Sequence, residues 1–184
     1  AGSRHRVGGA RLAGDVGRHG RKGRPTESRA TVGIGSEFVK GAGTSVLAVV
    51  VGPRRLSAGI IDPNGAALVR DRIATPTREV WRSLEQLVLR VLAARPGDVV
   101  KPSMVAVSCS GPIDAGAGTV SPAALESWSQ FPLQQQLEVL TGLPVMLDTL
   151  AGATAEAELR FGGTLGASTF FTLILDHAVE SACV

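Results

Sequence analysis

The chain has 184 residues, and 44% of them are hydrophobic, which is enough to bury one medium-sized core and excludes a chain that is disordered throughout. Its formal net charge of +3 is uneven, because residues 1–40 hold nine Lys/Arg against three Asp/Glu, while residues 41–184 hold ten against thirteen. The basic pI therefore points to nucleic acid or an acidic membrane surface only for the front of the chain.

Residues 1–44 are rich in Gly and Arg and show neither helical nor strand periodicity. We expect a disordered basic tail. It is either a solvated extension or an arm that touches nucleic acid phosphates weakly, since no helix-turn-helix pattern follows it.

From Ser45 onward the sequence consists of short apolar runs separated by residues that are typical of turns. The alternation predicts strands at 45–51, 56–62 and 66–74 that form an antiparallel meander. The first two are joined by a turn reading Gly52-Pro53-Arg54-Arg55, and the last two by a tight turn at Asp62-Pro63-Asn64-Gly65.

A helix is expected next, with Thr75-Pro76 as its cap and first residue. It has one apolar stripe and ends at Arg95-Pro96-Gly97. The stripe consists of Val80, Leu84, Leu87, Val88 and Val91.

The second half alternates strands and helices. A buried strand at 103–109 ends in Ser110-Gly111-Pro112, and a polar excursion through Ser121-Pro122 follows. The remaining pattern predicts a helix at 132–142 capped by Gly142, a strand at 143–148, a helix at 150–161 and a strand at 168–176.

The order of a three-strand meander followed by alternating helices and strands is that of one half of an α/β, actin-like or hexokinase-like (ribonuclease H-like) fold. The segments that carry a resemblance are VLAVVVG, SAGIIDPNG, VAVSCSGPIDAGAGTVSPAALESW, FPLQQQLEVLTGLPVMLD and FFTLILDHAVESACV. They resemble the ROK family of bacterial sugar kinases and sugar-responsive repressors. The resemblance implies an N-terminal actin-like domain at 45–165 and only the first strand of a truncated second lobe at 166–184.

In that family the first strand ends in an aspartate followed by a Gly-Gly-Thr-Lys turn that approaches phosphate. The ungapped match puts Val50 at the aspartate, Gly52 at the first glycine and Pro53, which has no N–H, at the second. Only Gly52, Arg54 and Arg55 remain as weak cofactor-binding candidates, and an exposed arginine pair in a turn is more often simply solvated.

The family's general base lies in an Asp-Asn-Asp run, which here reads Asp148-Thr149-Leu150. Leucine accepts no proton, so no catalytic residue is predicted. Asp148 is the one nearby carboxylate, and along a strand it would be displaced by roughly 6.5 Å from the base position. It is a strand-end residue that could still bond a ligand.

The family's second phosphate turn is rich in glycine and threonine. The equivalent positions here are Asp176, His177, Ala178, Glu180, Ser181 and Ala182. Carboxylates at that turn repel ATP, and the lost glycines remove left-handed conformations. A lone His near the chain end is more often without function than a metal ligand, and no metal site is expected.

The positions that border the sugar in the family differ less from the family pattern than the phosphate-binding and general-base positions do. Substrate-binding candidates implied by the resemblance are Gly111, Pro112, Ser121, Asp148 and Thr149. Ala124 stands where an asparagine is common, so some polar contacts to a hexose are missing. Trp128 could stack on a sugar ring, but a core position is favoured.

These positions predict a ROK-like pseudoenzyme, degenerate or truncated, that binds at most a hexose weakly and needs no cofactor. One alternative is an active glucokinase or N-acetylmannosamine kinase using ATP with Mg. Another is a sugar-responsive transcriptional regulator. The apolar last strand, belonging to a lobe that is absent, predicts self-association.

Cys109 and Cys183 have no CxxC partner, and no apolar run is long enough to span a bilayer. We expect reduced thiols in a soluble, cytoplasmic protein without a membrane partner.

Overall fold

The computed structural model describes residues 44–99, 101–163, 167–175 and 179–184, all within one compact unit, Ser36–Val184. The predicted basic tail lies outside the described residues except for Thr44. The elements in chain order are β1 (Ser45–Val51), β2 (Arg55–Ile61), β3 (Ala67–Ala74), α1 (Val80–Ala93), β4 (Pro102–Cys109), β5 (Ile113–Asp114), β6 (Thr119–Val120), α2 (Leu133–Thr141), β7 (Val145–Thr149), α3 (Leu150–Phe161), β8 (Phe171–Leu175) and β9 (Val179–Cys183). In the part of the chain described, no helix is long and apolar enough to cross a bilayer.

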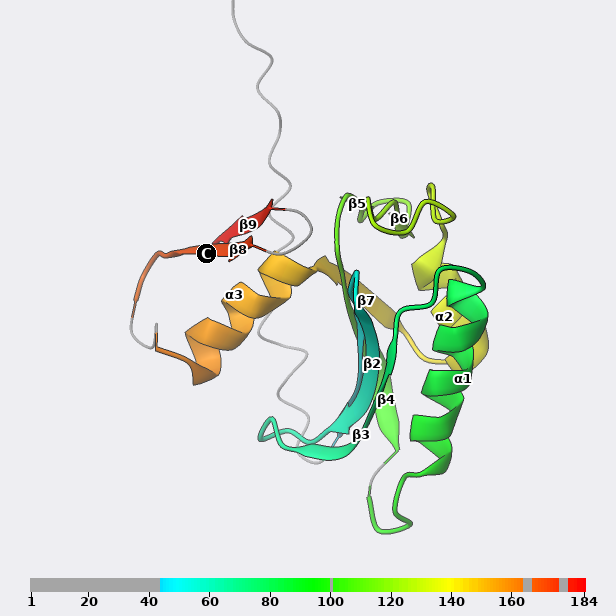
Figure 1. Ribbon diagram of the computed structural model, residues 1–184. Coiled ribbons are helices and arrows are strands. Elements are labelled where there is room, and N and C mark those ends of the chain that lie inside the picture. Colours follow the sequence, from blue (N-terminus) through cyan, green and yellow to red (C-terminus); the bar gives the residue numbers. More distant parts are fainter. Residues whose placement is uncertain (1–43, 100, 164–166, 176–178) are drawn as a thin grey trace, which may run out of the picture. The chain divides into compact units, whose positions relative to one another are not determined.

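A five-stranded mixed sheet in the order β3-β2-β1-β4-β7 forms the centre of the fold (Figure 1). The first three strands pair antiparallel, which confirms the predicted meander. β1 and β4 pair in parallel, as do β4 and β7, and the chain between each pair includes a helix, α1 in the first connection and α2 in the second. This is the predicted α/β arrangement of an actin-like N-terminal lobe.

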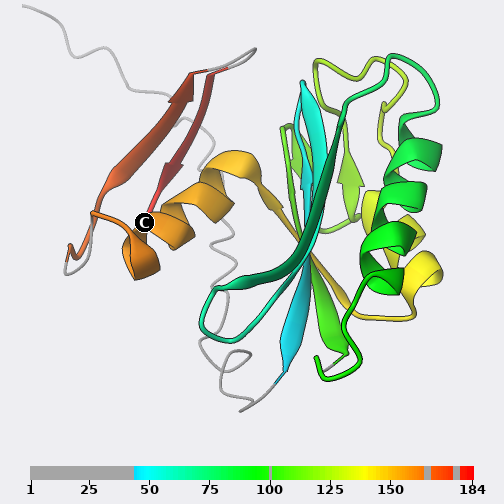
Figure 2. The same ribbon diagram turned by 60° about the horizontal axis from the view of Figure 1, so that its bottom comes forward.

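The core lies between one face of this sheet and helices α1 and α2, which Figure 2 shows on the same side of it. Strand side chains alternate between faces, so every second residue of β1 and β4 enters this core. The predicted stripe of α1 is buried as expected. Gly142 ends α2 with a φ of 69°, in the left-handed region that glycine adopts without a steric penalty.

The predicted start of α1 is wrong. The helix begins at Val80, and Glu79, with φ 52°, precedes it. Thr75 is held instead by the β1–β2 turn, because its hydroxyl donates to the Gly52 carbonyl (2.9 Å) and its amide donates to the Arg54 carbonyl (3.0 Å). A tertiary contact has overridden the local capping pattern.

The polar excursion after β4 contains the short β5–β6 pair and a small aromatic cluster. Trp128 is 3% exposed and stacks on Phe131 with ring centroids 4.3 Å apart, and Phe131 also lies 5.9 Å from Trp81. The core interpretation of Trp128 is therefore confirmed.

The chain's last strands form a hairpin that the sequence did not predict. β8 pairs antiparallel with β9, and both contact α3. β8 therefore has a partner strand along one edge, while one face of the hairpin stays uncovered. Phe171, Leu173, Leu175 and Val179 on that face are between 50% and 72% exposed.

Candidate functional site

The loops that hold the predicted site residues leave the sheet at one edge. Cys109 of β4 is in register with both Val51 of β1 and Thr149 of β7. The carboxyl ends of these parallel strands therefore lie side by side, which is the usual place for a ligand in an open α/β sheet. Gly52, Gly111 and Asp148 are thus brought to a common edge.

The loop after β1 is a closed hairpin turn. The Gly52 amide donates to the Arg55 carbonyl (3.0 Å), and the Gly52 carbonyl accepts from Thr75. Pro53 has no amide to donate. Gly52 is buried, and a Cβ there would stand 3.2 Å from the Arg55 carbonyl. The Gly52 amide, which corresponds to a phosphate-binding amide in the family, is therefore bonded within the turn. The Arg54 and Arg55 side chains are exposed.

The junction between β7 and α3 fixes the three residues of the base motif. Thr149 is the last residue of β7, and its hydroxyl caps α3 by accepting from the Gly152 amide (2.9 Å). Leu150 is the first residue of the helix. The predicted helix at 150–161 is therefore confirmed, and the strand spacing of roughly 6.5 Å between Asp148 and Leu150 does not apply, because the backbone changes from strand to helix between them.

The Asp148 carboxylate faces the first turn of α3. Its Oδ1 accepts from the Thr149 amide (2.6 Å). A Cβ on Gly152 would lie 2.6 Å from the same oxygen, so any larger residue there would displace the Asp148 carboxylate. Burial raises the pKa of Asp148 above its usual value, the Thr149 amide lowers it, and the charge of Glu156 raises it. Asp148 is a partly desolvated carboxylate at the end of β7 that accepts from the adjacent Thr149 amide, and it does not occupy the position of Leu150.

The predicted sugar-binding loop is ordered by its own contacts. Gly111 and Pro112 are joined by a cis peptide bond, and the Pro112 carbonyl accepts from the Ser121 amide (2.9 Å). The Ser121 hydroxyl oxygen accepts from the amide of Gln130 (2.8 Å). Its proton is still available for a ligand, whereas Ala124 is exposed and offers only a methyl group.

The second phosphate turn is shorter than predicted. Glu180, Ser181 and Ala182 belong to β9, where they pair with residues of β8, so the family's loop cannot extend over them. Asp176, His177 and Ala178 lie outside the described residues. Glu180 has one carboxylate oxygen, Oε2, that is fully buried and without a hydrogen-bond partner.

The described residues do not fit ATP with Mg. A nucleotide site needs amides or cations on the phosphates and a carboxylate for the metal. The end of β1 is apolar, and the Gly52 amide is bonded to the Arg55 carbonyl within its own turn. Among the described residues no group of three or more His, Cys, Asp or Glu could hold a metal ion.

Two features of this edge were missed from the sequence. The positive φ of Gln130 (50°) goes with the bond from its amide to Ser121, and a non-glycine residue gives no signal of this conformation. Thr149 acts as an N-cap with Gly152 three residues later, and a search for helix caps would have found it.

The fold and the strand-end loops define a lobe of the hexokinase-like class. Residues 46–179 match the model of the ROK family, and the chain belongs to that family. Glucokinase of Streptomyces coelicolor is 32% identical over 122 residues, which cover 65% of this chain and 37% of the relative.

Two solved structures show the same fold. The first is a ROK family glucokinase from Streptomyces griseus in complex with glucose and AMPPNP, with a TM-score of 0.65 and 24% identity over 76% of this chain and 44% of that one. The second is a ROK family transcriptional regulator, a homologue of the E. coli MLC protein, with a TM-score of 0.69 and 18% identity over 78% of this chain and 37% of that one. The chain thus spans less than half the length of each of these relatives.

Proposed function

We propose that this chain is a sugar-kinase-like ROK lobe that does not catalyse phosphoryl transfer and at most binds a hexose weakly. The carrying observation is the β7–α3 junction, where Leu150 opens the helix at the general-base position and Asp148 is bonded to the Thr149 amide. Proton transfer requires a base within hydrogen-bond reach of the sugar hydroxyl, and a hydrocarbon side chain supplies none.

The closed β1–β2 turn supports the same proposal from the nucleotide side. The amide of Gly52 is bonded within the turn, and Pro53 offers no donor. We therefore propose that ATP and Mg are not cofactors of this chain. The cis Gly111-Pro112 unit and the Ser121 hydroxyl remain as contacts for a hexose.

Titration calorimetry with glucose and with Mg-ATP in separate experiments tests the two half-sites independently. We expect weak heats with glucose that are lost in the Ser121→Ala variant, and no saturable heats with Mg-ATP. Saturable Mg-ATP binding that is lost on replacing Arg54 and Arg55 by Gln would contradict the nucleotide half of the proposal.

The relatives suggest two alternative functions, an active sugar kinase and a sugar-responsive regulator. An active kinase would need a base other than Leu150 and a second lobe. A sugar-responsive regulator would need a DNA-reading element, and the described residues contain no helix-turn-helix. Neither is favoured by a specific contact at the strand-end edge.

Self-association through the β8–β9 hairpin is part of the proposal, with residues 166–184 as the start of a second lobe. Its uncovered face is apolar, and exposed apolar strands tend to pair with other chains. Light scattering across a concentration series should show dimers or larger species, and fewer of them after Leu173→Ser. A monomer at every concentration would refute this part.

Free Cys109 and Cys183 suit the cytoplasmic location that we also propose.

A further inference from the structure

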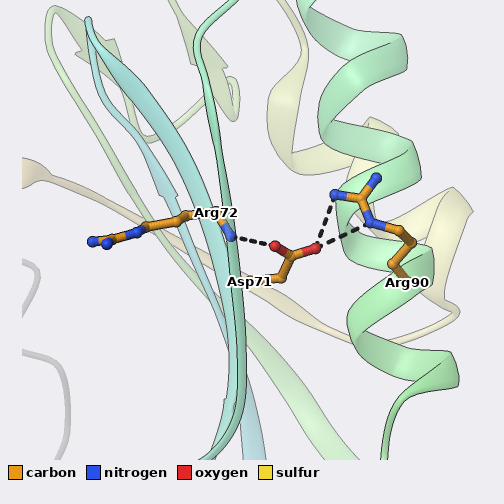
Figure 3. A network of polar contacts seen from close by, with 3 residues as sticks. All are labelled: Asp71, Arg72 and Arg90. Carbon is orange, nitrogen blue, oxygen red and sulfur yellow. Dashed lines mark hydrogen bonds and ion pairs between the residues drawn. The ribbon is translucent and has the colours of Figure 1, made fainter.

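Three arginines form a row on the face of the β2–β3 hairpin that is turned away from α1. Arg70 of β3 is opposite Gly59 of β2, Arg72 is opposite Ser57, and Arg55 is opposite Ala74. Directly opposed residues of an antiparallel pair share a face, so all three guanidinium groups leave the same side. Figure 3 shows the Arg72 side chain extending away from α1, whereas Asp71 on the other face points to the helix.

The neighbouring side chains leave this row uncovered. The cross-strand partners Gly59, Ser57 and Ala74 are small, and Arg55, Arg70 and Arg72 are all exposed. A Cβ at Gly59 would meet the Val69 carbonyl at 2.8 Å, so the position opposite Arg70 has to stay without a side chain.

No carboxylate among the described residues neutralises the row. Asp71 is bonded to Arg90 on the opposite face through Nε (3.0 Å) and Nη2 (2.9 Å). Asp62 accepts from the amides of its own turn. Asp148 is on β7, at the other edge of the sheet and four strands from β3, or roughly 19 Å away.

The row also has a regular repeat. Arg70 and Arg72 are two residues apart on one strand, or roughly 6.7 Å. Arg72 and Arg55 are diagonal neighbours across the hairpin, about 7 to 8 Å apart. Like charges held in such a line repel one another, and a linear ligand with a similar repeat of negative charge would relieve this repulsion. The phosphates along one strand of nucleic acid have this arrangement.

We propose that Arg70, Arg72 and Arg55 form a sequence-independent binding surface for the phosphate backbone of a nucleic acid strand. The face has no aromatic side chain in the described strands on which a base could stack, so the contact is to phosphate and carries no base preference. This surface shares only Arg55 with the loops at the strand ends, includes none of the sugar-binding candidates, and does not rest on the proposed function.

The test uses the full chain and a fluorescent 20-nucleotide poly-dT strand, with binding followed by polarisation over a series of salt concentrations. We expect the triple variant Arg55→Gln/Arg70→Gln/Arg72→Gln to bind at least about tenfold more weakly at low salt and to lower the slope of log K against log salt by about 2, because each lost phosphate contact removes about 0.7. The corresponding triple Lys variant should keep the slope.

A charge-matched control separates this surface from the net charge of the protein. The variant Arg78→Gln/Arg82→Gln/Lys101→Gln removes the same charge from other exposed positions. The basic N-terminal residues are unchanged in both variants, so their contribution cancels. Equal losses in the two variants, or no loss in the first, would overturn the proposal. Row-dependent binding of inorganic polyphosphate without binding of poly-dT would overturn the assignment to nucleic acid. Thermal melting checks that each variant is folded.

Discussion

The two ends of the same strands have been shaped by different requirements. Along their length, β1 and β4 present alternate apolar side chains to α1 and α2, and these are buried almost completely. At their carboxyl ends, we propose that the groups that kinase chemistry requires are replaced, as at Leu150, or bonded within the fold, as at the Gly52 amide. Packing accepts many apolar side chains of suitable volume, whereas a proton acceptor or an unbonded amide has to be one particular atom in one place. A lobe can therefore keep its fold without its reaction.

The largest effect is expected from the packed region. Leu84→Ala removes a fully buried side chain of α1 and should lower the free energy of unfolding by about 2 to 5 kcal/mol. Leu89→Ala is the matched control on the same helix, since Leu89 is 47% exposed. Urea denaturation measures both, and equal losses would show that the core is not where the stability resides.

The second prediction concerns the pH dependence of stability, which the buried Cys109 thiol at the end of β4 should determine at high pH. Burial, together with the charge of Glu180, raises the pKa of Cys109 to about 12 from 9.0. Between pH 9 and 12 the thiol stays protonated in the folded state but loses its proton in the unfolded state. The free energy of unfolding should therefore fall as pH rises from 9 towards 12, on the order of 1 kcal/mol per pH unit.

The measurement is the urea midpoint at pH 8, 9 and 10, compared with that of Cys109→Ala, which should have a flatter profile. Alkylation at pH 8 should modify exposed Cys183 and leave Cys109 intact. Rapid modification of both thiols in the folded protein would contradict the burial of Cys109.

At the strand ends, the cap of α3 should matter to a smaller degree. Thr149→Ala removes the acceptor for the Gly152 amide and should cost about 1 kcal/mol. Thr149→Ser keeps the hydroxyl and should behave nearly as the unchanged protein in thermal melting. A loss of the same size in the serine variant would assign the effect to the methyl group instead of the cap.

The smallest expected effect concerns whether the ionised Asp148 carboxylate stabilises or destabilises the fold. Its folded pKa is raised, so the folded state prefers the protonated form, and stability should decline as pH rises through the usual Asp range from about 4. Asp148→Asn should remove this decline and leave stability at pH 7 equal or slightly higher. A large loss at pH 7 would mean that the ionised carboxylate stabilises the fold.

Several elements could be predicted from sequence because their signals are local. The alternation in 45–51 and the apolar stripe of α1 both come directly from side-chain periodicity. The start of α1 could not, because Thr75 bonds to a turn more than twenty residues earlier in the chain. The β8–β9 hairpin was missed because Glu180, Ser181 and Ala182, which pair with β8, were assigned to a phosphate-binding turn.

The residue types assigned to the candidate site stay predictions from the motifs, and part of the geometry around them could not be predicted from sequence. The absence of a base at Leu150 is evident from the motif. The strand to 148 and the helix from 150 were predicted, whereas the close approach of the Asp148 carboxylate to Gly152 in the first turn of α3 was not. Such close approaches are properties of the folded chain.

The most direct measurement for the central claim is a coupled assay of the full chain with Mg-ATP and glucose, mannose or N-acetylmannosamine, beside the Asp148→Asn variant. We expect no hexose-dependent ADP formation above the protein-free rate for either form, because Leu150 cannot accept the hydroxyl proton. Clear turnover that disappears in Asp148→Asn would show that Asp148 acts as the base, and would contradict the claim.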